Sequence, residues 1–142
     1  MASFSDYSED KVLNYLLRGE AFAVPNLYLA LFTSSAGLEA NTPLTQTEVG
    51  TSGTGYARVA VPSYTGFSAA ASGQSSNTVS LEFPTAQTDW GNITHGAYMD
   101  AEIGGNVIWW SALSAPRVVY SGDSIRFAPN TSVITLDEQV ML

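Results

Sequence analysis

The most constraining feature of the sequence is a series of short apolar segments separated by turn residues about every ten positions. In residues 78–83, apolar Val79, Leu81 and Phe83 alternate with polar side chains, which is the pattern of a half-buried strand. No helical segments alternate with these runs, as βαβ units would require. The chain is therefore predicted to be all-β, an antiparallel β-sandwich of jelly-roll or Ig-like type. The expected strands, about eight in number, cover residues 27–33, 56–61, 78–83, 93–99, 107–113, 115–120, 124–129 and 131–137.

Two segments indicate where strands lie in this sheet. Residues 27–33, LYLALFT, are apolar on both alternating faces, which predicts a central strand rather than an edge. Residues 102–106 contain Gly104 and Gly105, which tolerate positive φ and predict a hairpin turn before residues 107–113.

One helix is predicted at the N-terminus, over residues 6–18. Asp6 is the expected N-cap, Glu9 follows three residues later as in a capping box, and Gly19 is the expected C-terminal stop. One apolar stripe is formed by Val12, Leu13, Leu16 and Leu17. A helix this short needs a surface to dock on. Docking on its own sheet is the first expectation, and docking on another subunit is the alternative.

A long polar stretch, residues 34–55, separates the first two expected strands. Loops of this length in a compact domain are uncommon and are usually functional or disordered. We expect either an arm that contacts a partner or a disordered insertion. Gly50 and Gly55 have the spacing of a phosphate-binding loop, but Tyr56 and Ala57 stand where such a loop needs Lys and Ser or Thr. The stretch is therefore interpreted as a surface turn that leads into a strand.

Size and charge restrict the class of protein. The 142 residues are expected to form a single domain, 1–142, with a short apolar tail over 138–142. The net charge of −8 disfavours nucleic acid and anionic membranes as partners. No apolar run is long enough to span a membrane, and the acidic N-terminal residues do not resemble a signal peptide.

The residues that could support catalysis or bind a metal do not form a recognisable set. The chain has no cysteine and one histidine, His95, which is expected on an apolar strand face with Ile93, Ala97 and Met99. No zinc-protease, calcium-loop or serine-hydrolase motif is present. We expect no enzyme activity, no cofactor and no metal site.

Protein contacts are the more promising kind of site. Trp109 and Trp110 are adjacent on a strand, so one should enter the core and the other face solvent or a partner. The candidate interface residues are Leu13, Leu16, Leu17, Glu39, Glu48, Tyr56, Trp109, Trp110, Met141 and Leu142.

Several segments resemble, in order, a family of small virion proteins of tailed bacteriophages. These segments are NLYLALFT, EVGTSGTGYARVAV, SNTVSLEFPTAQTDWGNITHGAYMDA, GGNVIWWSAL and VYSGDSIRFAPNTSVITLD, and they cover residues 26–137. Members of this family are usually labelled "phage tail fibre protein". The chain is also similar to cement or decoration proteins, which sit as trimers on some phage heads.

The resemblance implies a non-enzymatic structural protein located in the virion. We expect a capsid cement or decoration protein that contacts the major capsid protein or other virion proteins, and we expect a homotrimer. The chain has no heptads or other shaft-forming repeats, which favours this form. The alternative is a tail fibre or baseplate component that contacts the host surface, and an unrelated soluble enzyme is a remote third reading.

Overall fold

The computed structural model describes residues 2–24 and 26–136. Within them, most of the regular structure is β-strand, and one α-helix is present, α1 (Asp6–Arg18). The strands are β1 (Ala2–Phe4), β2 (Leu27–Phe32), β3 (Val59–Val61), β4 (Gln74–Ser76), β5 (Leu81–Glu82), β6 (Gly91–Met99), β7 (Val107–Val119), β8 (Arg126–Phe127) and β9 (Val133–Thr135). A short 3-10 helix, η1, covers Pro43–Thr45.

Five strands form the main sheet, in the order β1-β7-β6-β2-β3, and every pairing is antiparallel. The hairpin of β6 and β7 is its longest element, and its turn places Gly104 and Gly105 at φ 66° and 77°. Strand β2 lies between β6 and β3, and its residues Ala30, Leu31 and Phe32 are fully buried. The predicted hairpin and the predicted central strand are both confirmed.

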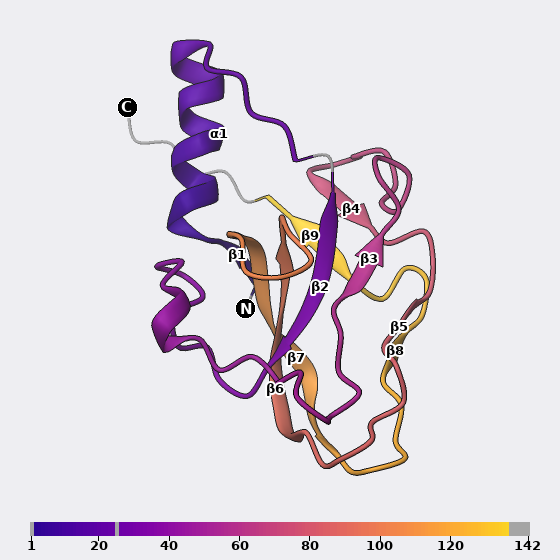
Figure 1. Cartoon of the computed structure of the whole chain (residues 1–142). Helices are drawn as coiled ribbons and strands as arrows, with labels where there is room; N and C mark the ends of the chain where they lie inside the picture. The colour runs from indigo at the N-terminus through magenta and orange to yellow at the C-terminus, as the bar shows by residue number, and fades with distance from the viewer. Residues whose placement is uncertain (1, 25, 137–142) are drawn as a thin grey trace.

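A second layer covers one face of this sheet. It consists of two short antiparallel pairs, β4 with β9 and β5 with β8 (Figure 1). Leu81 and Phe83 point inward from this layer, while Thr78, Ser80 and Glu82 are exposed, as the alternation predicted. They meet Leu29, Tyr98 and Trp109 of the main sheet in the larger apolar core. The predicted all-β, sandwich-like architecture is confirmed.

The opposite face of the sheet has a smaller core of its own. Here Ala30, Phe32, Ala97, Met99 and Val107 are buried together with Leu38, which comes from the 34–55 segment. Figure 1 shows this segment and η1 on one side of the central strands and β5 and β8 on the other. Residues 34–55 are therefore neither an extended arm nor a disordered insertion, because Leu38 packs on the second face of the sheet and Glu48 pairs with Phe32 of β2.

Several strand boundaries differ from the prediction. The segments 107–113 and 115–120 form one strand, β7, in which Pro116 is tolerated near an irregular register with β6. Strands β3, β5 and β8 are much shorter than expected, and β1 and β4 were not predicted. Ile93 was expected on the same strand face as His95. The register shift between these two residues instead points Ile93 into the larger core, while His95 stays on the face that it shares with Ala97.

Candidate partner-binding site

Helix α1 has the predicted bounds but a different N-cap. Ser5 is the cap, and its side-chain oxygen accepts a hydrogen bond from the backbone N–H of Ser8 at 3.2 Å. The same hydroxyl donates to the carbonyl of Val107, which fixes the start of the helix to β7. Asp6 is instead the first helical residue, and Gly19 ends the helix at φ 69°, as predicted.

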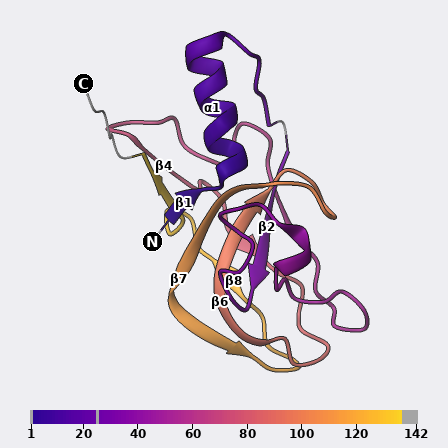
Figure 2. The same ribbon diagram turned by 90° about the vertical axis from the view of Figure 1, so that its left-hand side faces the viewer.

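Beyond its first two turns, α1 leaves the body of the protein. Ser8 is the one buried residue of the helix, and Figure 2 shows α1 rising away from the sheet. Leu13, Leu16 and Leu17 are 52%, 68% and 78% exposed. The expectation that the helix packs its stripe on its own sheet is therefore wrong for the residues that the structure describes, and an apolar surface results.

Acidic side chains surround the base of this helix. Carboxylate oxygens of Asp6, Glu9 and Glu39 lie within 4.8 Å of one another. Desolvation and the neighbouring Glu39 carboxylate raise the pKa of Asp6 and of Glu9. Exposed acidic groups of this kind are common without a bound ion, and Asp6 and Glu9 are both exposed. The cluster is therefore an acidic surface, and no metal is assigned to it.

Glu39, one of the candidate interface residues, lies at the base of α1 beside Trp110 and Ser3. One of its carboxylate oxygens accepts hydrogen bonds from the indole N–H of Trp110 at 2.8 Å and from the Ser3 hydroxyl at 3.0 Å. Trp110 is partly exposed, whereas Trp109 is 5% exposed and packs edge-on against Phe4 with ring centroids 4.5 Å apart. Trp110 is therefore the more accessible of the two tryptophans, and Trp109 is a core residue.

Glu48 and Tyr56 are engaged inside the protein rather than presented to a partner. Both carboxylate oxygens of Glu48 bind the guanidinium of Arg58, at 2.7 and 2.8 Å. The Tyr56 hydroxyl donates to Glu48 at 2.6 Å and accepts from the backbone N–H of Leu31 at 3.0 Å. Burial raises the pKa of Tyr56 far above its ordinary value, so the phenol stays neutral. Including these two residues in the interface was wrong, because Tyr56 is 4% exposed and Glu48 neutralises a buried arginine.

The last two candidates, Met141 and Leu142, lie outside the described residues. His95 is half-buried, with its ring centroid 6.0 Å from that of Trp110. Its Nδ1 is 2.7 Å from the Thr94 hydroxyl, and burial lowers its pKa, so the ring is neutral at pH 7. No described carboxylate is hydrogen-bonded to it, which leaves a catalytic pair without support.

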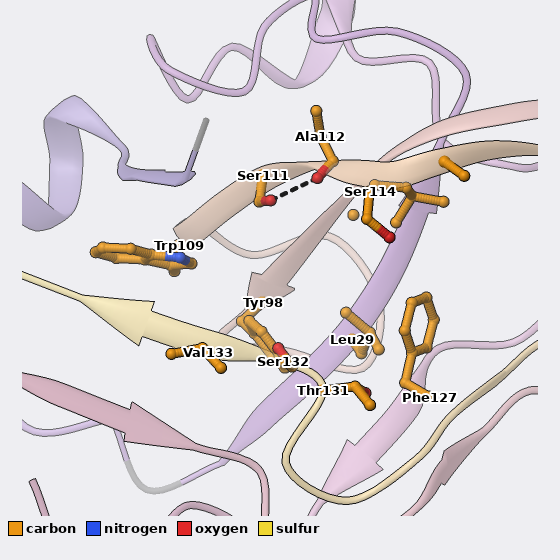
Figure 3. A pocket seen from close by; sticks show the side chains of 13 residues that line it. Leu29, Tyr98, Trp109, Ser111, Ala112, Ser114, Phe127, Thr131, Ser132 and Val133 are labelled. Atoms are coloured by element: carbon orange, nitrogen blue, oxygen red, sulfur yellow. Dashed lines mark hydrogen bonds between the residues drawn. The ribbon is translucent and has the colours of Figure 1, made fainter.

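A pocket of about 360 Å³ lies along β7, and no motif of the sequence had pointed to it (Figure 3). The buried side chains of Leu29, Tyr98 and Trp109 are among its lining, and hydroxyls of Ser111 and Ser132 are among its polar groups. Burial raises the pKa of Tyr98 to about 12, and its hydroxyl lies 2.6 Å from that of Ser132. Its described lining contains no acid, histidine or amine, so it offers no general acid or base at neutral pH.

The comparison with known families identifies the chain. A family model described as "Podophage GP4 fiber I protein gp80" matches residues 3–135. The chain belongs to this family. The family is one of phage fibre proteins, which implies a structural role and a location in the virion. No curated protein matches the chain. Within the described residues, no helix is long and apolar enough to cross a membrane.

Proposed function

We propose that this protein is a non-enzymatic structural subunit of a podophage fibre, held in place by protein–protein contacts. The family match carries this proposal, because it extends from β1 to β9 and so includes α1 and both layers of the sandwich. The architecture suits a structural role. A sheet covered on both faces gives a stiff body, and α1 extends from it with three exposed leucines.

A capsid decoration protein is the second candidate. The sequence favours it because its 142 residues contain no heptads and no shaft-forming repeats. If the protein is a fibre subunit, the lack of shaft-forming repeats means that the chain is a module attached to a longer fibre protein. Both readings use the same kind of contact, in which many copies stabilise an assembly by mass action.

Cryo-electron microscopy of purified particles distinguishes the two candidates. We expect density that fits the five-stranded sheet and projecting α1 along the fibres. Density only at symmetry positions of the head would favour decoration instead. Mass spectrometry of the same particles is the control for incorporation, and particles that lack the chain altogether would overturn both candidates.

The oligomeric state is a separate prediction. A homotrimer is expected from the similarity to head decoration proteins, and light scattering of the isolated chain measures it directly. A monomer at micromolar concentration would contradict this expectation without affecting the proposed place in the virion.

A further inference from the structure

The outward face of α1 has an acidic base and an apolar tip. Asp6, Glu9 and Asp10 lie in the first turns, and Leu13, Leu16 and Leu17 follow at spacings of three, four and seven residues. In an α-helix these spacings place side chains on one face. The leucines are more than half exposed, and Asp6, Glu9 and Asp10 are exposed as well. A partner that covers the leucines therefore also meets the carboxylates.

The pattern of the three leucines is that of a helix bound in a groove. Anchors at positions i, i+3 and i+4 are the signature of this recognition mode. Leu13, Leu16 and Leu17 occupy positions i, i+3 and i+4. Only about one turn of helix carries these anchors, so the contact depends on the surrounding charges as well as on the apolar area.

The charges argue against a second copy of the chain as the occupant. In a parallel pair of α1 helices, Asp6 and Glu9 of one copy would face the same carboxylates of the other. In an antiparallel pair, the acidic base of each helix would face the leucines of its partner. Glu39 adds a further carboxylate beside Asp6 and Glu9, and the chain carries a net charge of −8. Both arrangements are therefore unfavourable.

We propose that α1 docks into an apolar groove of a different virion protein, which carries Lys or Arg side chains where it receives the N-terminal end of the helix. This inference deepens the proposed function and rests on it for the statement that the partner is a virion protein. The leucine tip fills the groove, and the basic residues neutralise the cluster of Asp6, Glu9 and Glu39. The raised pKa values of Asp6 and Glu9 fit this arrangement, because a neighbouring cation relieves the repulsion between the carboxylates.

Photo-crosslinking in assembled particles tests the identity of the occupant. The chain is produced with p-benzoylphenylalanine in place of Leu17, and the crosslinked peptides of purified particles are sequenced by mass spectrometry. Leu44, which is 98% exposed in η1, is the matched control position. We expect Leu17, and not Leu44, to crosslink to a segment of another virion protein that contains Lys or Arg. A crosslink to a second copy of this chain, or none to any virion protein, would overturn the inference.

Substitutions test the two halves of the face separately. L16E/L17E should lower incorporation into particles by roughly tenfold or more, since a few buried anchors commonly carry this much of a binding constant. L44E is its control. E9Q/D10N should also lower incorporation, whereas E102Q/D123N, which removes two charges elsewhere on the exposed surface, should not. If E9Q/D10N and E102Q/D123N lowered incorporation equally, the proposal that the partner carries Lys or Arg side chains at this site would be wrong.

Two readouts separate failure of this inference from failure of the proposed function. Circular dichroism confirms that each variant keeps its helix. Light scattering should give the same mass for L16E/L17E as for the unmodified chain, and a lower mass would show that α1 binds a second copy. The chain would then still be a virion protein, whereas its absence from unmodified particles contradicts the proposed function itself.

Discussion

The composition of helix α1 suggests that it packs on the sheet, and that of the 34–55 segment suggests that it is exposed. The structure shows the reverse for the leucines of α1 and for Leu38. The helix has an apolar stripe, yet its leucines face outward and only its first turns touch the body. The 34–55 segment is polar, yet Leu38 is fully buried and Glu48 forms a β-bridge with Phe32. The sheet has two apolar faces. One is covered by the strand pairs β4–β9 and β5–β8, and the other is covered in part by Leu38.

The comparison shows that the number of apolar residues does not decide where a segment packs. A few backbone hydrogen bonds hold residues 47–49 beside β2, among them Val49 N–H to the carbonyl of Leu31 at 3.1 Å and Thr33 N–H to that of Thr47 at 3.1 Å. Two buried side chains add apolar contacts, Leu38 in the smaller core and Val49 in the larger. Helix α1 has more apolar side chains, but Ser5 anchors it at one end and its stripe points away from the sheet. A contiguous exposed apolar patch is a marker of interaction sites, which is why the proposed contact is placed on this stripe.

The largest expected effect concerns Leu38. Leu38→Ala should lower the free energy of unfolding by about 4 kcal/mol, because a fully buried leucine leaves a cavity in the smaller core. Denaturant unfolding measures this value. Leu44→Ala in the same segment should change stability by less than about 0.5 kcal/mol, since Leu44 is 98% exposed. Similar small effects of both substitutions would show that the segment does not cover the sheet in solution.

The Glu48–Arg58 pair gives the next largest effect. The Arg58 side chain is 6% exposed, and it also donates to the carbonyls of Ala101 and Gly104 at 2.8 and 2.7 Å. Arg58→Ala should lower the free energy of unfolding by about 2–3 kcal/mol, since it leaves Glu48 and two carbonyls without their donor. The loss is smaller than for a fully buried pair because Glu48 is partly exposed. Exposed Arg117→Ala is the control. If both variants unfold at the same denaturant concentration, the end of the 34–55 segment is not held by this pair.

The sequence predicted the parts of the fold that depend on local patterns. Alternation identified the inward side chains Leu81 and Phe83, and glycines identified the turn of the β6–β7 hairpin. The bulge beside His95 has no such signal, because it depends on how β6 pairs with β7. Strand β1 is three residues long and owes its existence to pairing with Trp109–Ser111 of β7. The bulge and β1 depend on how one strand pairs with another and not on a local sequence pattern, so the sequence alone could not predict them.

The candidate interface was predictable only where it depends on one element. The helical period placed Leu13, Leu16 and Leu17 on one face, but it could not show whether that face meets the sheet. Glu48 and Tyr56 looked exposed in a polar, glycine-rich context, and their pairing with Arg58 and with the backbone of Leu31 is set by the tertiary fold. The acidic cluster likewise joins Glu39 to a helix that starts 33 positions earlier, at Asp6.

A smaller effect is expected for the anchor of α1. Ser5→Ala should lower the free energy of unfolding by about 1 kcal/mol, because the N-cap is lost and the Ser8 N–H then lacks its acceptor. The helix has few other contacts with the body, so hydrogen exchange should rise more in residues 14–18 than in β6. Ser52→Ala, at an exposed position, is the control. Equal protection of the C-terminal half of α1 in both variants would mean that another contact holds the helix.

The smallest effect concerns the acidic cluster and depends on pH. A carboxyl group whose pKa is raised in the folded protein stabilises the fold at acid pH, and this contribution is lost as the pH rises through the raised value. Asp6 and Glu9 are such groups, because of desolvation and the nearby Glu39. Glu39→Gln should therefore raise the melting temperature slightly at pH 7 and leave it unchanged near pH 3, where Asp6 and Glu9 are protonated because their pKa values are raised. The glutamine oxygen can still accept from Trp110, and Glu102→Gln, which changes the net charge equally, is the control. A lower melting temperature at pH 7 would mean that the Glu39 carboxylate stabilises the base of α1 through its hydrogen bonds more than it destabilises it by repulsion.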